Sequence, residues 1–196
     1  MRHVTRPRPW IARRSDTRFR YVDFYRPAAE PTGEAASMEL ALATGRGPRP
    51  LTDPEGRGPL LRDEDVVAFG FRDTAESTEA GIQPLPPRLH TIDLHGVRAV
   101  GAAAAARRAI DRLGNEESAG YWVHLDVDVL DDALMPAVDH RIPGGLTWLV
   151  LESVLRIALA DERAVGLDVT IFNPRLDPDA TPAARLVECL GRGLRP

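Results

Sequence analysis

Short apolar runs alternate with helical patterns along most of this chain, and that alternation constrains the fold most. Apolar, strand-like runs occupy residues 65–71, 89–94, 121–129 and 164–172. Helical patterns occupy residues 34–44, 97–113, 147–160 and the stretch that begins at Thr181-Pro182. Strands that alternate with helices are typical of a parallel sheet covered by helices on its faces. The pattern therefore predicts an α/β fold.

Size and composition narrow the possible functions. The chain has 196 residues, of which 43% are hydrophobic, and this is enough for one domain with a substantial core. Its formal net charge of −4 argues against nucleic acid as a partner, and no apolar run approaches the roughly 18 residues of a membrane span. The single cysteine, Cys189, is expected to be a buried, unreactive thiol, and its isolation favours a cytoplasmic setting. All 25 basic residues are arginine, so the chemistry of a reactive lysine is excluded.

The first 22 residues differ from the rest of the chain. They contain seven arginines and one acidic residue, Asp16, and show no sustained apolar period. A transit peptide or a nucleic-acid-binding arm has this composition, and so does out-of-frame or misplaced-start sequence from a GC-rich gene. We expect residues 1–22 to be a disordered or artefactual segment, and residues 23–196 to form the folded domain.

The stretch HLDVDVLD at residues 124–131 is the strongest functional signal. Asp126 and Asp128 follow an apolar run, where a parallel strand would present them at its carboxyl end. A buried carboxylate is unfavourable unless it is paired or binds a metal, and two carboxylates on one strand face suit a hard ion such as Mn²⁺ or Mg²⁺. We expect His124 to face away from Asp126, as a core histidine or a neighbour of the site.

Other interpretations of the Asp-x-Asp pattern remain open at this point. A hydrogen-bonded strand end that meets an arginine would need no metal. An EF-hand is excluded, because Asp131 occupies the position where its loop requires glycine. The haloacid-dehalogenase-type phosphatases also end a strand in Asp-x-Asp, but there the motif opens the chain and is accompanied by a lysine, which this chain lacks.

Two further motifs follow the first one in order. They are Gly144-Gly145-Leu146-Thr147 and the segment from Gly166-Leu-Asp168 to Asn173-Pro174. Together with Asp126-Val-Asp128, this series resembles the arginase, or ureohydrolase, family over about residues 23–190. The resemblance implies a three-layer α/β/α fold with a mainly parallel sheet, here incomplete because the part that would precede Asp23 is missing.

The resemblance also implies a reaction. In the family, two Mn²⁺ ions bridged by hydroxide hydrolyse a C–N bond of a guanidinium or amidine, and two cations can lower the pKa of a bound water enough for this. On this match Asp126 ligates both ions and Asp128 one, and the catalytic group is the metal-bound hydroxide. Asp23 aligns with the last residue of the family's Asp-x-His-x-Asp segment, and Asp131 is expected to order the loop after the motif.

The chain departs from the family pattern among the ligands. Nothing matches the Gly-Gly-Asp-His segment, and Tyr21 and Phe19 replace the His and the first Asp of Asp-x-His-x-Asp. Asp23, Asp126 and Asp128 remain, so we expect one loosely held ion or none in place of two.

A second group of departures concerns the substrate. Ile171 occupies the position where arginases place a glutamate against the guanidinium, which makes arginine itself an unexpected substrate. Asp139, His140 and Arg141 replace the usual Pro-Gly-Thr-Gly segment and are candidates for contacts with substrate or within the loop.

Two functions are consistent with these residues. The first is a Mn²⁺-dependent ureohydrolase that acts on a small linear guanidine or amidine in the cytoplasm, without nucleic acid or membrane partners. The second is a degenerate relative that keeps the fold as a binding or oligomerisation module. In either case the missing strands would leave apolar surface exposed, so we expect a homo-oligomer.

Overall fold

A computed structural model describes residues 15–19, 24, 25, 27, 35–73, 84–113 and 120–194, with only the backbone described for 15–19. The strands are β1 Ser15–Phe19, β2 Val66–Phe69, β3 His90–Ile92, β4 Tyr121–Asp126 and β5 Ala164–Thr170. The α-helices are α1 Glu39–Ala43, α2 Arg49–Thr52, α4 Leu94–Val100, α5 Ala102–Leu113, α6 Trp148–Ala160 and α7 Thr181–Gly193. Short 3₁₀ turns occupy Ala35–Ser37, Asp63–Asp65, Val127–Val129 and Pro174–Leu176.

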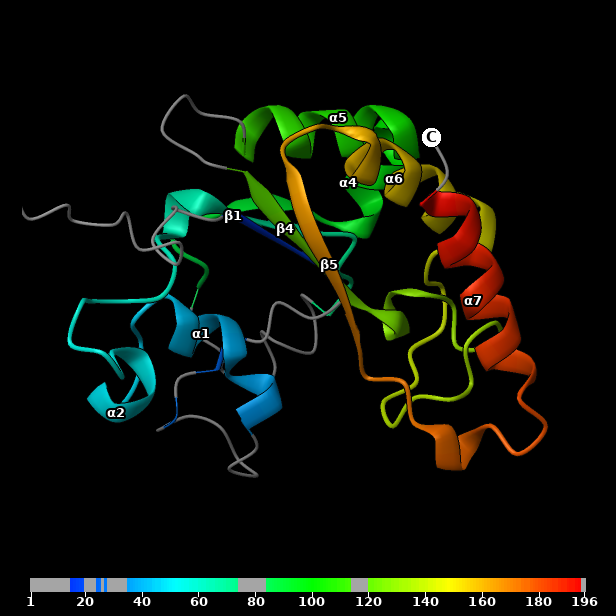
Figure 1. Ribbon diagram of the computed structural model, residues 1–196, viewed down its shortest axis with the longest axis horizontal. Helices are drawn as coiled ribbons and strands as arrows, with labels where there is room; N and C mark the ends of the chain where they lie inside the picture. Colours follow the sequence, from blue (N-terminus) through cyan, green and yellow to red (C-terminus); the bar gives the residue numbers. More distant parts are fainter. Residues whose placement is uncertain are drawn as a thin grey trace, which may run out of the picture.

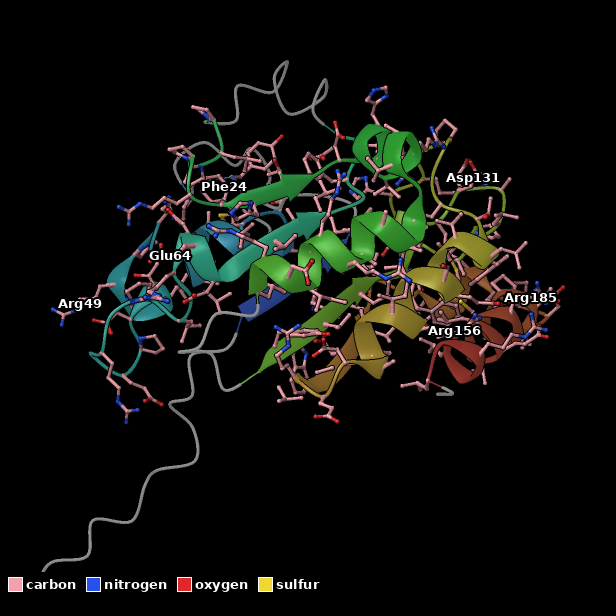
Figure 2. The ribbon with its side chains drawn as sticks, turned by 90° about the horizontal axis from the view of Figure 1, so that it is seen from above. Phe24, Arg49, Glu64, Asp131, Arg156 and Arg185 are labelled. Atoms are coloured by element: carbon pink, nitrogen blue, oxygen red, sulfur yellow. The ribbon has the colours of Figure 1, made fainter. Side chains whose placement is uncertain are left out.

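The five strands form one sheet in the order β3-β2-β1-β4-β5, and every pair is parallel. Helices α4, α5 and α6 lie along one side of this sheet, and α1 and α2 lie on the other (Figure 1). Seen from the side of α5, Asp131 lies at one end of the molecule, and Arg49 and Glu64 lie at the other (Figure 2). The predicted three-layer α/β/α fold with a parallel sheet is therefore confirmed. Within the described residues, no helix is long and apolar enough to cross a membrane.

The core divides at the sheet. Val123 and Leu125 of β4 point toward α5 and α6 and pack in the larger cluster with residues such as Ile110 and Leu151. The even-numbered residues of β2, Val66 and Ala68, pack with α1 in a smaller cluster on the other face of the sheet. The buried members of this cluster are Phe24, Leu40, Ala41, Val66, Ala68, Phe71 and Leu89. Alternate residues of a strand point to opposite faces, so even-numbered β4 residues lie on the face away from α5 and α6.

The position of β1 corrects one expectation. Residues 1–22 were expected to contain no regular element, yet Ser15–Phe19 forms the central strand, paired with β2 on one side and β4 on the other. The expectation is wrong for these five residues. The division of the chain at residue 22 stays a prediction, because residues 1–14 and 20–23 lie outside the described residues.

Three other boundaries differ from the sequence expectations. The strand predicted at 121–129 ends at Asp126, and a 3₁₀ turn follows it. The single helix predicted at 97–113 is two helices, because Gly101 adopts φ = 85° between α4 and α5. The strand predicted as buried at 164–172 is partly exposed along its length, because it is an edge of the sheet formed by the described residues.

Candidate functional site

Asp126 and Asp128 lie together at the carboxyl end of β4. Asp126 is the last residue of the strand, and Asp128 lies within the 3₁₀ turn that follows it. Each is only 5% exposed. The expectation that both carboxylates extend from one strand face is wrong in detail, because the strand ends before Asp128. Two buried carboxylates nevertheless lie at the carboxyl ends of the strands, where ligands of parallel α/β folds bind.

The carboxylate of Asp126 is held by residues of the neighbouring strand. In the register of β4 and β5, Asp126 is opposite Thr170 and His124 is opposite Asp168. The hydroxyl of Thr170 donates a hydrogen bond to Oδ1 of Asp126. The Nε2 atom of His124 lies 3.3 Å from the same oxygen.

A second carboxylate holds the imidazole of His124 from its other side. The Nδ1 atom of His124 lies 2.6 Å from Oδ2 of Asp168, and the indole N–H of Trp122 donates to Oδ1 of the same carboxylate. The Trp122 ring lies against Gly166, where an added Cβ would be 2.1 Å from the ring. The glycine of the Gly-Leu-Asp motif therefore makes room for the indole that holds Asp168.

The expectation that His124 faces away from Asp126 is wrong. Residues 124 and 126 are two positions apart in a strand, so they share a face. The same parity places Asp168 and Thr170 beside them. Sequence analysis missed these two residues, and the parity of β4 and β5 was the signal that could have found them.

The turn that carries Asp128 is held by an arginine from the end of β2. The Nη2 atom of the Arg72 guanidinium donates hydrogen bonds to the backbone carbonyls of Asp128, Leu130 and Ile142 at 3.1, 3.2 and 2.6 Å. One guanidinium thus joins the turn at 128–130 to the loop at 142. Sequence analysis also missed Arg72, because its partners are main-chain atoms that no motif identifies.

The loop after the turn is closed by Asp131 and the Gly-Gly motif. The Asp131 carboxylate accepts hydrogen bonds from the backbone N–H groups of Gly144 at 2.6 Å and Ala133 at 3.1 Å. These hydrogen bonds lower the pKa of Asp131, that from Gly144 most strongly. Gly144 adopts φ = 79°, and a Cβ at Gly145 would be 2.3 Å from the backbone of Leu130. The expectation that Asp131 orders this loop is confirmed.

Three of the other predicted site residues belong to the loop that follows the turn. Asp139 accepts a hydrogen bond of 2.7 Å from the side-chain amide of Asn173, and Arg141 donates to the carbonyl of Asp132 at 2.9 Å. His140 is exposed in the same loop. Asp23 lies outside the described residues. The roles of these four residues stay predictions.

The described residues do not complete a metal site. Among them, no three histidine, cysteine, aspartate or glutamate side chains form a group that could hold a metal ion. Asp126 and Asp128 supply two oxygen ligands of the chemistry that Mn²⁺ prefers. A resident pair of ions would need ligands from elsewhere, so no reaction step is assigned to a metal here.

Ile171 has an unusual backbone at the end of β5. It adopts φ = 71°, which is rare for a β-branched residue, and it is 39% exposed. Ile171 directly follows Thr170, whose hydroxyl donates to Asp126, so an exposed apolar residue comes next along the chain after a neighbour of Asp126.

Comparison with known proteins agrees with the fold and the motifs. Residues 50–191 match the model of the Arginase family. An arginase from Staphylococcus aureus (strain MRSA252) is 25% identical over 165 residues, which cover 84% of this chain and 53% of that protein. The N(omega)-hydroxy-L-arginine amidinohydrolase of Streptomyces lavendulae is 29% identical over 167 residues, which cover 83% and 52%.

A solved structure gives the same result for the fold. The native arginase from Bacillus caldovelox superimposes with a TM-score of 0.78 at 24% identity, covering 93% of this chain and 60% of that one. The chain spans about half the length of the relatives it matches in sequence. The family match argues against the phosphatase alternative, and it covers most of the chain. The chain belongs to the arginase family.

Proposed function

We propose that this chain belongs to a hydrolase that cleaves a C–N bond of a small, linear guanidine or amidine other than arginine. The proposal rests on family membership, which supports an amidinohydrolase, together with the site at the end of β4. The names of its relatives, arginase and N(omega)-hydroxy-L-arginine amidinohydrolase, describe small guanidino substrates. We further propose a cytoplasmic setting.

One observation supports this proposal most directly. Asp126 and Asp128 are both 5% exposed and lie at the carboxyl edge of a parallel sheet. Burial of two carboxylates is unfavourable unless cations compensate them. A site that retains both is suited to a divalent cation, to a cationic substrate, or to both.

Mn²⁺ is the cation we propose. When bound, such an ion would activate a water molecule for attack on the substrate carbon. Asp126 and Asp128 would contribute oxygen ligands, and Asp23 would contribute a third if it lies where the sequence match predicts. Three carboxylates favour a single, weakly held ion over a tightly held pair, because no imidazole from an Asp-x-His-x-Asp segment is present.

Ile171 is the reason for excluding arginine. Its side chain is exposed and carries no charge with which to pair a guanidinium, and Ile171 directly follows Thr170, whose hydroxyl donates to Asp126. An apolar neighbour favours a substrate whose reacting end is smaller or less strongly cationic. Hydroxylated guanidines and formimino groups have this character.

The test measures urea or ammonia release from arginine, agmatine, guanidinobutyrate and formiminoglutamate, with and without added Mn²⁺. We expect turnover of at least one substrate other than arginine only when Mn²⁺ is present. Asp126→Asn should abolish that turnover, and Arg88→Met should not, because it changes a side chain that is 76% exposed beside Glu64, at the end of the molecule opposite Asp131 (Figure 2). Metal-independent turnover, or turnover that survives Asp126→Asn, would contradict the proposal.

A second candidate function is a non-catalytic binding or oligomerisation module. It is favoured by the lack, within the described residues, of any group of three potential metal-ligating side chains. The two candidates differ in solution. A module would show no turnover with any of the four substrates and a defined, concentration-dependent assembly in analytical ultracentrifugation, with Mn²⁺ changing neither result.

A further inference from the structure

The hydrogen bonds to the Asp126 carboxylate are asymmetric. Within the described part of the chain, the polar contacts with Thr170 and His124 go to one oxygen, Oδ1, which accepts a hydrogen bond from the Thr170 hydroxyl and lies 3.3 Å from Nε2 of His124. The Oδ2 atom is not used by these neighbours. A carboxylate held through one oxygen presents the other in a fixed direction.

The group that holds Oδ1 is itself fixed. His124 has a side chain 13% exposed, and both of its ring nitrogens meet polar partners. Its Nδ1 lies 2.6 Å from Asp168, and Asp168 also accepts from the indole of Trp122. Rotation of the imidazole about its side-chain bonds would break these contacts, so the ring has one favoured orientation.

We propose that His124 and Asp168 are positioning residues for Asp126. The series Trp122, Asp168, His124 holds Oδ1 of Asp126 against the sheet and directs Oδ2 toward the mouth of the site as the donor for a divalent cation. The use of Oδ2 by a cation rests on the proposed function. The fixed orientation of the carboxylate does not.

Two physical arguments favour this role over simple strand pairing. Partly buried polar groups on an edge strand could be replaced by apolar residues without loss of stability, yet four polar or aromatic side chains are arranged here so that each nitrogen meets an oxygen. Neighbouring polar groups that fix the orientation of a metal-ligating side chain are also a recurring feature of metal sites. In both respects the network is organised around Asp126.

The first test uses the metal-free 196-residue chain. Long-range ¹H–¹⁵N spectra of the imidazole should show a proton on Nδ1 of His124, because the Asp168 carboxylate can only accept. Asp168→Asn should shift that signal, and His124→Gln should shift the side-chain carboxyl ¹³C resonance of Asp126. A bare Nδ1 in the wild type, or an Asp126 resonance that does not respond to His124→Gln, would overturn the proposal.

The second test measures Mn²⁺ affinity by electron paramagnetic resonance. We expect His124→Gln and Asp168→Asn each to weaken Mn²⁺ binding by about 10- to 100-fold, as substitutions that disturb ligand orientation commonly do. His90→Gln, on β3 at the other edge of the sheet, is the matched control and should leave the affinity unchanged. Circular dichroism and thermal melts establish that all three variants are folded.

A conservative pair separates positioning from packing. Thr170→Ser keeps the hydroxyl and should retain Mn²⁺ affinity, whereas Thr170→Val keeps the shape and should lose it. If the His124→Gln and Asp168→Asn variants bind Mn²⁺ as tightly as the wild type does, the proposal is overturned. A wild-type chain that binds no Mn²⁺ would contradict the proposed function, and the metal-free spectra would then decide the positioning role alone.

Discussion

The guanidinium of Arg72 lies 3.1 Å from the carbonyl oxygen of Asp128 and 2.6 Å from that of Ile142, so one side chain from the segment after β2 joins two segments of the site. Hydrogen bonds from a charged donor to partly buried carbonyls contribute more than neutral ones. Arg72→Met should therefore lower the free energy of unfolding by roughly 2–3 kcal/mol. Urea titration followed by circular dichroism measures this.

The matched control for Arg72 is Arg88→Met. Arg88 is 76% exposed and its nearest carboxylate, on Glu64, is 4.0 Å away. An exposed pair of this kind contributes little, so the control should stay within about 0.5 kcal/mol of the wild type. Equal effects of the two substitutions would show that Arg72 does not support the turn.

Gly166→Ala tests the contact between Trp122 and β5. The new Cβ would lie 2.1 Å from the indole, so the ring must move away from Asp168. We expect a loss of about 1–3 kcal/mol and a changed tryptophan fluorescence spectrum. Gly191→Ala in α7 meets nothing within 4 Å and should be neutral or stabilising, because alanine favours a helix more than glycine does.

Asp131 should make stability depend on pH in the acid range. Hydrogen bonds from backbone N–H groups, chiefly that of Gly144, lower its pKa in the native state. Its contribution is therefore present above the unfolded pKa of about 3.9 and is lost as pH falls through the lower native pKa. Asp131→Asn should be less stable than the wild type at pH 7, and the difference should shrink below pH 4. A difference that does not change between pH 7 and pH 3 would contradict this assignment.

The residue before α7 has a strained backbone. Ala180 is exposed and adopts φ = 56°, a region that disfavours residues with a Cβ. Ala180→Gly should raise the free energy of unfolding by about 0.5–1 kcal/mol. The control, Ala184→Gly on the exposed side of the same helix, should lower it by about 1 kcal/mol. Thermal melts of the two variants should thus shift in opposite directions.

Cys189 should be unreactive in the folded chain. It is 1% exposed on α7, and burial raises the pKa of its thiol to about 12. Because the thiolate is the reactive form, a disulfide reagent at pH 8 should modify the native protein far more slowly than the protein in urea. Cys189 is the single cysteine in the sequence, so the absorbance of the thiolate released by the reagent reports on this one site. Rapid modification of the native chain would contradict its burial.

The sequence predicted the strands whose apolar runs are uninterrupted, such as Val66–Phe69, and the helix that Thr147 caps through Val150. It could not predict β1, because its sequence, SDTRF, contains one large apolar residue, whereas a central strand usually contains several. The start of α7 at Thr181 was also predicted, and Asp177 accepts a hydrogen bond from the N–H of Ala183 in its first turn.

The candidate site was predicted in part for a related reason. Asp126 and Asp128 were identified because acidic residues in an apolar run are conspicuous. His124, Asp168 and Thr170 belong to the site only through the register of β4 with β5, and Arg72 only through main-chain carbonyls 56 or more residues away. Contacts of that range follow from the packed fold and leave little local trace in the sequence.

The central place of β1 has a consequence for how the protein is made. Ser15 pairs with Tyr121, so β1 must wait for β2 and then for β4 before both of its edges are hydrogen-bonded. Pairings this distant along the chain form slowly, because the intervening loop must close first. The nascent chain therefore carries β1 with one edge unpaired from the synthesis of β2 until the synthesis of β4. Ribosome-bound chaperones are the factors best placed to protect it during that interval.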